Sequence, residues 1–310
     1  PPRPAHQSGT IHIFILLEVF IMSDYIIITD SSCDLPHSLV QELELTVLPL
    51  SFIMDGKTYR NWPDNRDMSP DEFYSKEREG LMATTNAVNV GEAADALESV
   101  LKQGKDALVL AFSSGLSATC NSFQIAAQEL AEQFPERKII VVDTLCASLG
   151  QGMLVYQAAK LRQQGRTMEE VRDWAEANKL RQCHWFTVND LFFLKKGGRV
   201  SAATAVVGTM LQIKPVLHVD NEGHLINVAK ARGRKASLLA LVDKVGELAD
   251  DPAGQTMFIS NSDCAEDAQF VADEIKQRYG TKEIIINSIG PVIGAHTLSL
   301  IHISEPTRPY

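Results

Sequence analysis

The sequence predicts an α/β protein in which a doubly wound parallel sheet comes first and a second α/β domain follows. Short β-branched runs such as Tyr25–Thr29 and Ala107–Phe112 alternate with helical segments at the spacing of β–α–β units. Loops of small polar residues follow these runs. Because the carboxyl ends of parallel strands meet at one edge of a sheet, the loops are expected to border a single ligand crevice.

The composition narrows the functional class. The chain has 310 residues, is 45% hydrophobic and 22% charged, and carries a net charge of −10. These values are typical of a globular protein. The negative charge argues against nucleic acid as a partner, because binding phosphates requires a basic field. Five cysteines are scattered without the spacing of a metal site or a disulfide framework. We therefore expect reduced thiols, no metal, no cofactor and a cytoplasmic location.

The two ends of the chain differ from the rest. Residues 1–21 are expected to be a non-native extension, because the apolar stretch Ile11–Met22 is too short to span a bilayer as a helix. Residues 22–180 are expected to form the first domain and residues 181–296 the second. Residues 297–310 match no element pattern and have the character of a foreign tail.

Periodicity and capping signals locate the elements of the first domain. Polar loops are expected at Asp30–Asp34 and Thr84–Asn89. The expected strands are Tyr25–Thr29, Thr46–Met54 with a returning arm at Lys57–Tyr59, Ala107–Phe112 and Lys138–Val142. The expected helices are a short one from Pro36, Pro70–Glu79 capped by Ser69, one capped by Asn89, one ending near Phe134, Ser148–Gln164, and Met168–Leu180 capped by Thr167.

The second domain is expected to mix strands and helices with less regular spacing. Its expected strands are Cys183–Thr187, the hairpin of Val216–Asp220 with His224–Lys230, Met257–Ser260 and Glu283–Ser288. Its expected helices are Asp190–Lys196, Ala202–Leu211, one ending at Ala249, and Ala265–Tyr279.

A serine-rich loop between a buried strand and a helix is the clearest binding signal. Ser113, Ser114, Ser117 and Thr119 supply hydroxyl groups, and the start of the helix aims backbone N–H groups at the same place. This arrangement suits a carboxylate or phosphate, although such loops also cap their own helices. The sequence contains neither the glycine pattern of a dinucleotide site nor that of a P-loop.

Seven short motifs follow one another between residues 25 and 296. They are Thr29-Asp-Ser-Ser-Cys-Asp-Leu35, Thr84-Thr-Asn-Ala87, Ser113-Ser-Gly-Leu-Ser-Ala-Thr119, Asp143-Thr144 with Ser148, Leu194-Lys-Lys-Gly-Gly-Arg-Val-Ser201, Ile213-Lys-Pro-Val216 and Gly290-Pro-Val-Ile-Gly-Ala-His296. In this order they resemble the DegV family, whose characterised members bind fatty acids.

The resemblance implies a two-domain DegV-like fold that holds one long-chain fatty acid between its domains. In bacteria, such proteins serve as the binding subunit of fatty acid kinase. A separate ATP-binding subunit phosphorylates the carboxylate, and the acyl-phosphate feeds phospholipid synthesis. By this resemblance the chain is a lipid carrier, not a complete enzyme. We further expect a monomer that makes at most transient contact with membranes.

The resemblance also assigns the carboxylate-binding residues. Thr84 matches the first hydroxyl of the family's Thr-Ser loop, Ser117 and the backbone N–H of Ala118 match its Ser-Gly loop, and His296 matches its histidine. Glycine is the family residue where Ala118 stands. The supporting candidates are Thr85, Ser113, Ser114 and Thr119. Neutral donors and one histidine are expected to hold the anion without a buried lysine or arginine.

Two further groups of residues have expected roles in the second domain. The basic clusters around Arg199, Lys230 and Arg232 are expected to dock the kinase subunit, with Arg199 near the transferred phosphoryl group. The apolar residues expected to supply the acyl-chain wall include Phe192, Phe193, Leu194, Val207, Met210, Leu211 and Ile213.

Two other functional classes stay open. A small-anion or phosphosugar sensor on the same fold would have a short polar pocket instead of an apolar one. A serine esterase would use Ser117 as its nucleophile with His296 as the base. The sequence lacks the G-x-S-x-G elbow of many such enzymes.

Overall fold

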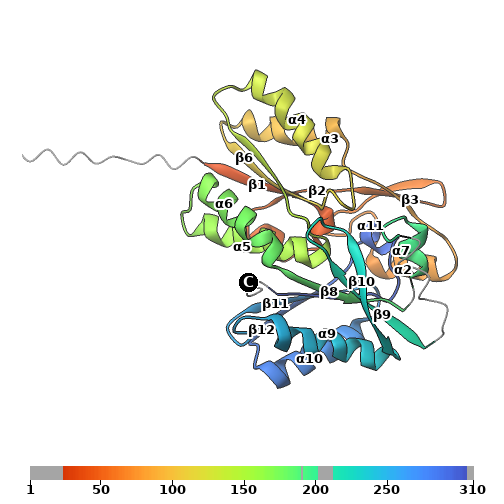
Figure 1. Ribbon diagram of the computed structural model, residues 1–310. Coiled ribbons are helices and arrows are strands. Elements are labelled where there is room, and N and C mark those ends of the chain that lie inside the picture. The colour runs from red at the N-terminus through yellow and green to blue at the C-terminus, as the bar shows by residue number, and fades with distance from the viewer. Residues whose placement is uncertain (1–23, 190, 202–211, 306–310) are drawn as a thin grey trace, which may run out of the picture.

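The computed structural model describes residues 24–189, 191–201 and 212–305. These residues form two halves, each built on its own main sheet, that lie against one another (Figure 1). In the view of Figure 1 the first half, coloured red to light green, is above the second, coloured green to blue. The expected extension at residues 1–21 and the expected helix at Ala202–Leu211 lie outside the described residues.

The first half contains the predicted parallel sheet. Its strands run in the order β2 (Thr46–Leu48), β1 (Tyr25–Asp30), β6 (Asp106–Ala111) and β7 (Ile139–Asp143), and every neighbouring pair is parallel. All six residues of β6 are buried, as expected for a central strand whose two faces are both covered. The strand order reverses at β1, which is the topological feature of a doubly wound sheet.

Helices cover both faces of this sheet, as Figure 1 shows. One face packs against α3 (Val90–Leu101) and α4 (Thr119–Gln133). The other packs against α1 (His37–Glu42), α5 (Ser148–Gln163) and α6 (Met168–Asn178), and short turns η1 (Ser31–Cys33) and η2 (Lys179–Arg181) connect the elements. The predicted caps of α3 and α6 are present, because Asn89 with Glu92 and Thr167 with Glu170 form reciprocal capping boxes.

A small antiparallel sheet lies beside the parallel one and corrects two expectations. It runs β4 (Lys57–Arg60), β3 (Ser51–Met54), β5 (Thr84–Asn86), and α2 (Pro70–Arg78) lies between β4 and β5 in the chain. The single strand expected at Thr46–Met54 is therefore two strands in different sheets, separated at Pro49, which has no N–H to donate. The polar loop expected from Thr84 begins with strand β5, which pairs with β3.

The second half is built on a mixed six-stranded sheet. Its order is β10 (Leu225–Arg232), β9 (Ile213–Val219), β8 (Cys183–Thr187), β13 (Ile301–Glu305), β11 (Thr256–Asn261) and β12 (Glu283–Ser288), and only β11 and β12 are parallel. Two long helices, α9 (Arg234–Leu248) and α10 (Ala265–Tyr279), cover its outer face (Figure 1). Two short ones, α7 (Phe192–Lys196) and α11 (Pro291–Gly294), lie beside α2.

Strand β13 corrects the expectation that residues 297–310 lie outside the domain. It pairs antiparallel with β8 on one side and β11 on the other, so it occupies an interior position of the sheet. The reason is the alternation of Ile301 and Ile303 with polar neighbours, which buries both isoleucines in the core under α9 and α10. This period-two pattern is visible in the sequence at residues 301–304.

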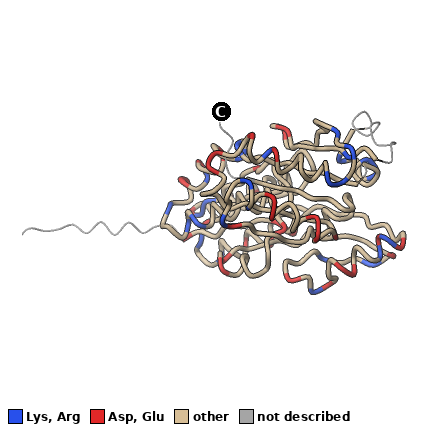
Figure 2. The backbone as a smooth tube through the Cα atoms, turned by 90° about the horizontal axis from the view of Figure 1, so that it is seen from below, with Lys and Arg blue, Asp and Glu red and all other residues tan. Residues whose placement is uncertain are grey.

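Two properties concern the described chain as a whole, namely the length of its apolar helices and the distribution of its charged residues. None of its helices is long and apolar enough to cross a membrane. Acidic and basic residues are interspersed along the described backbone, as the red and blue segments of Figure 2 show.

Candidate functional site

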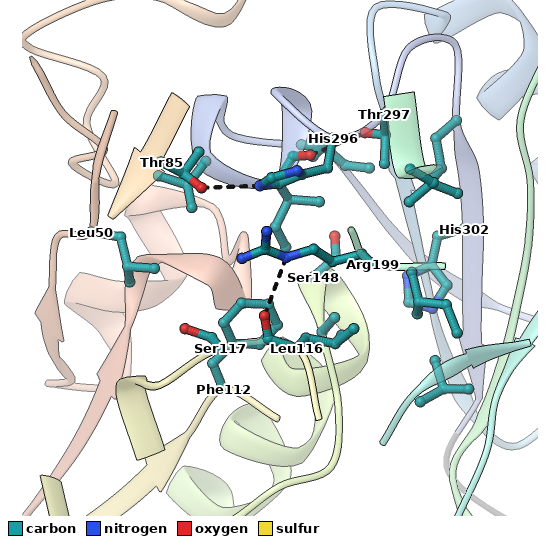
Figure 3. Close-up of a pocket in the computed structure, with 18 of the residues that line it drawn as sticks. Leu50, Thr85, Phe112, Leu116, Ser117, Ser148, Arg199, His296, Thr297 and His302 are labelled. Atoms are coloured by element: carbon teal, nitrogen blue, oxygen red, sulfur yellow. Dashed lines mark hydrogen bonds between the residues drawn. The ribbon is translucent and has the colours of Figure 1, made fainter. Parts of the chain in front are cut away.

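A cavity of about 250 Å³ lies between the two halves of the chain. Side chains from both halves line it, and most of them are apolar (Figure 3). The apolar lining residues are Leu50, Ala87, Phe112, Leu116, Ala118, Ala147, Phe186, Leu194, Val219, Leu225, Ile289, Val292, Ile293 and Leu300. A wall of this kind fits a hydrocarbon chain better than a hydrated ion.

The polar groups of the cavity include one interaction between the two halves. Thr85, on strand β5, lies with its Oγ1 atom 3.0 Å from Nε2 of His296, which follows α11 (Figure 3). Nδ1 of His296 is buried and has no hydrogen-bond partner among the described residues. It faces Gly197, because a Cβ atom placed on Gly197 would stand 2.0 Å from it. The absence of a side chain at Gly197 therefore leaves room for the imidazole.

Arg199 is the only lysine or arginine among the described lining residues, which include no carboxylate. Figure 3 shows its side chain extending between His296 and Ser117. Its Nε atom donates to the carbonyl oxygen of Leu116 at 3.3 Å. Burial lowers the pKa of this guanidinium, but an arginine stays charged at neutral pH. Half-buried Arg199 thus lies in the wall beside the neutral donors and the histidine that the resemblance implied.

The electrostatics of His296 follow from the same surroundings. Burial, together with the positive charge of Arg199, lowers the pKa of His296 to about 4. At neutral pH the imidazole is thus uncharged, and the positive charge of the cavity resides on Arg199. An anion at this position would meet one cation and several neutral hydrogen-bond donors.

The serine loop contributes two of its expected residues to the cavity. Ser117 and Ala118 line the wall at the start of α4. Ser117 Oγ accepts from the backbone N–H of Thr119 at 3.3 Å and shares a 3.0 Å hydrogen bond with the Thr119 hydroxyl. Ala118 has ordinary right-handed backbone angles, with φ of −75°, so this geometry does not require a glycine.

The structure does not bring the remaining sequence candidates into the cavity. Thr84 is exposed and absent from the wall, because successive side chains of β5 point to opposite sides and Thr85 takes the inward position. Ser114 is exposed. The Ser113 hydroxyl is buried and donates to the Gly223 carbonyl at 2.9 Å, in the turn between β9 and β10. Thr119 is fully buried, and its Oγ1 accepts from the backbone N–H of Val88.

A buried carboxylate holds the segment that leads to His296. Asp34 accepts from the backbone N–H of Gly290 at 2.9 Å and from the Ser148 hydroxyl at 2.6 Å. Burial raises the pKa of Asp34 to about 7. Next to it, the Tyr74 hydroxyl donates to the carbonyl of Ile289 at 3.0 Å. Residues of the first half thus fix both ends of the peptide that enters α11. Asp34 and Ser148 lie in two of the family motifs, but no local pattern in the sequence indicates that their side chains meet.

The expected docking residues and wall residues separate in the structure. Lys230 and Arg232 are exposed and two residues apart on the edge strand β10, so they face the same side, whereas Arg199 lines the cavity. Of the expected acyl-chain wall, Leu194 lines the cavity and Phe192 is exposed. Phe193 and Ile213 are not among the lining residues. Val207, Met210 and Leu211 lie outside the described residues.

Metal and thiol chemistry find no support in the described part of the chain. It contains no group of three histidine, cysteine or acidic side chains arranged to hold a metal ion. All five cysteines are free, and burial raises the pKa of Cys33, Cys120, Cys146 and Cys264. Their thiols are thus poor nucleophiles at neutral pH.

Fold and site together define a two-domain α/β binding protein whose apolar cavity, with one cation in its wall, lies between the domains. The sequence model of the family described as "Uncharacterised protein, DegV family" matches residues 25–299. The chain belongs to the DegV family. A DegV domain-containing protein of Clostridium perfringens is 45% identical over 292 residues, which cover 93% of this chain and 100% of that protein.

Solved structures of relatives agree in fold. A DegV family protein from Thermus thermophilus, described for its fatty acid binding, is 31% identical with a TM-score of 0.83 and covers 92% of this chain and 99% of its own. DegV of Bacillus subtilis, described as a fatty acid binding protein, is 26% identical with a TM-score of 0.80, at 92% and 100% coverage. The predicted fold class and family resemblance are confirmed.

Proposed function

We propose that this chain binds a long-chain fatty acid in the cavity between its halves and presents the carboxylate to a separate kinase subunit. The observation that carries the binding step is the composition of the cavity wall, which is apolar except for a few hydroxyls, two histidines, one amide and Arg199. A hydrocarbon chain gains about 0.8 kcal/mol per buried CH₂ in such a wall. The fatty-acid binding described for the Thermus and Bacillus relatives supports the same ligand.

The carboxylate is proposed to lie near Arg199, Thr85 and Ser117. If the neutral His296 carries its proton on Nε2, it donates to Thr85 Oγ1, and the Thr85 hydroxyl is then free to donate to the ligand. Nδ1 is left as a bare acceptor against Gly197. Each hydrogen bond to a charged group contributes about 1.5–3 kcal/mol. His296 acts in this arrangement through Thr85, as a positioning residue.

The competing classes lack the geometry that they require. An esterase needs its serine hydrogen-bonded to a base. Ser117 bonds instead to Thr119, and His296 bonds to Thr85. A small-anion sensor needs a polar pocket, whereas the wall here is mainly apolar. We therefore propose a carrier without catalytic activity of its own, which works without a cofactor.

The exposed pair Lys230 and Arg232 is the proposed docking element for the kinase subunit. Neither side chain forms an ion pair with a described carboxylate, so both charges are available to an acidic partner. Arg199 is better suited to the ligand carboxylate and the phosphoryl group that it receives, because its side chain lies in the cavity wall.

Ser117→Ala and Ser114→Ala form a matched pair that tests the binding site. Affinity is measured by displacement of a fluorescent fatty acid from the full chain. Ser117→Ala is expected to weaken binding about tenfold, because one donor to the carboxylate is lost. Ser114→Ala, outside the cavity, is expected to leave binding unchanged. Equal affinities in the two variants would contradict the proposed position of the carboxylate.

The docking step has its own test. The double variant Lys230→Ala with Arg232→Ala is expected to slow acyl-phosphate formation by an added kinase subunit while fatty-acid affinity stays the same. Lys57→Ala, at an exposed lysine on β4, serves as the control for loss of a surface positive charge away from β10. Unchanged phosphorylation by the double variant would exclude β10 as the docking element.

A further inference from the structure

A second cavity, of about 480 Å³, also takes its walls from both halves of the chain. No described residue lines both cavities. The wall is formed by the segment from η1 to α1, the loop between β4 and α2, the start of α2, and the end of β12. In contrast to the first cavity, it is rich in carboxylates and carboxamides, namely Asp34, Asp64, Asp71, Asn61, Asn65 and Asn287.

The charges of this wall are unbalanced. No lysine or arginine is among its described lining residues, and His37 is its one imidazole. Asp64 is compensated, because Arg66 pairs with it at 2.7 Å. Asp34 forms no ion pair with a described residue, and its carboxylate accepts from the Gly290 N–H and the Ser148 hydroxyl. Only 7% of Asp34 is exposed, so water compensates little of its charge.

A second polar side chain in the wall has no hydrogen-bond partner among the residues that the structure describes. Asn61 is 5% exposed and lines the cavity. Its backbone N–H donates to the Leu50 carbonyl at 2.8 Å, but its side-chain amide forms no hydrogen bond with a described residue. The amide packs against Gly290, where an added Cβ would stand 2.7 Å from both amide atoms. An unused carboxamide therefore lies against the same residue whose N–H is bonded to Asp34.

We propose that the second cavity binds a small ammonium compound, which donates hydrogen bonds to the Asp34 carboxylate and the Asn61 carboxamide oxygen. Each Asp34 oxygen uses one lone pair in its existing hydrogen bond and retains another. An ammonium group has three donors and supplies the positive charge that the wall lacks. Anions are disfavoured by the carboxylates. Among the described residues, this site shares no lining residue with the fatty-acid cavity.

Ethanolamine and ethylene glycol are the probes, because they differ by the replacement of an ammonium group with a hydroxyl. The melting temperature of the full chain is followed at pH 7.5, with sodium chloride matching the ionic strength. Ethanolamine at ten times its dissociation constant is expected to raise the melting temperature by about 3 °C. Ethylene glycol is expected to leave it unchanged. An equal rise with both probes would overturn the proposal in favour of a polyol site, and no rise would overturn it outright.

Two variants test whether the ethanolamine-induced rise in melting temperature comes from the second cavity. Asp34→Asn removes the charge with little change of shape, and Asn61→Leu removes the amide at a residue whose side chain makes no hydrogen bond. Both are expected to abolish the ethanolamine shift, whereas Asp55→Asn, in the exposed β3–β4 turn, is expected to retain it. If Asp34→Asn does not fold, Asn61→Leu carries the test. An ethanolamine shift that persists in Asn61→Leu would contradict the assignment.

Calorimetry provides an independent measurement. Burial raises the pKa of Asp34 to about 7, so part of the population is protonated at pH 7. An ammonium ion that pairs with the carboxylate must expel this proton. The binding heat of ethanolamine is therefore expected to differ between buffers of unlike ionisation enthalpy, after correction for the amine's own titration. Identical heats at pH 7 would exclude Asp34 as the acceptor.

Discussion

Thr85 Oγ1 lies 3.0 Å from His296 Nε2, and this hydrogen bond joins residues 211 positions apart in the sequence. It connects strand β5 of the first half to the peptide that follows α11 of the second. Thr84, the neighbouring threonine, is exposed and outside the cavity wall. The two residues are therefore a natural comparison, with the same side chain on opposite sides of one strand.

Thr85→Val is expected to weaken fatty-acid binding about ten- to thirtyfold. The valine keeps the shape but removes the hydroxyl that is proposed to reach the carboxylate, and it leaves His296 without a partner on either nitrogen. Thr84→Val is expected to bind like wild type, and Thr85→Ser to regain most of the affinity. Displacement of a fluorescent fatty acid measures all three. A larger loss in Thr84→Val than in Thr85→Val would reverse the assignment.

Gly197→Ala is expected to weaken binding by displacing the His296 ring. The added Cβ would stand 2.0 Å from Nδ1, which is closer than any ordinary contact, and the backbone at Gly197 is otherwise compatible with alanine. The expected loss in affinity is about tenfold. Gly91→Ala, on the exposed start of α3, is the control and should bind normally. Retention of full affinity by Gly197→Ala would show that the ring has freedom to move.

Ser113→Ala is expected to act on stability instead of ligand contact. The buried hydroxyl donates to the Gly223 carbonyl, which is left without this donor in the variant. The expected cost is about 1–2 kcal/mol in the free energy of unfolding. Chemical denaturation measures it, and fatty-acid affinity of the folded variant should stay within about twofold of wild type. A strong loss of affinity with unchanged stability would return Ser113 to the headgroup site.

The stability of the chain is expected to depend on pH through Asp34. Burial raises its folded-state pKa from 3.8 to about 7, so between these values the folded state binds more protons than the unfolded state. The contribution of Asp34 is fully present below about pH 4 and is lost as the pH rises through 7. Wild type should therefore lose stability relative to Asp34→Asn between pH 4 and 8. Parallel stability curves for the two proteins would contradict the raised pKa.

The sequence predicted the helices and strands well where the signals for their ends lie within the element itself. The reciprocal caps at Asn89 and Thr167 and the apolar run of β6 correspond to a helix or strand in the structure. The predictions were wrong where the structure of a segment depends on pairing with a strand distant in the sequence. Thr84–Asn86 is a strand through its pairing with β3, and β13 is held in the sheet by its pairing with β8 and β11.

In the candidate site, too, the residues given by local motifs were predicted and those that depend on the three-dimensional arrangement were not. The family motifs led to Ser117, Ala118 and His296, and all three line one cavity. They could not select Thr85 over Thr84, because the choice depends on which face of β5 turns inward. The basic cluster predicted Arg199 to be a docking residue near the transferred phosphoryl group, whereas the structure places it in the cavity wall and leaves its neighbours Lys195 and Lys196 exposed. Arg199 follows the short helix α7, and the path of the chain there places its side chain in the cavity wall. The amino-acid composition of the segment does not reveal this path.

The most direct test of the central claim is mass spectrometry of organic-solvent extracts from the purified full chain. We expect one fatty acid per chain, released on denaturation and lost or strongly reduced in Thr85→Val but not in Thr84→Val. A folded wild-type protein that yields no acyl chain, and that takes none up when fatty acid is added, would contradict the proposal that this cavity is a fatty-acid site.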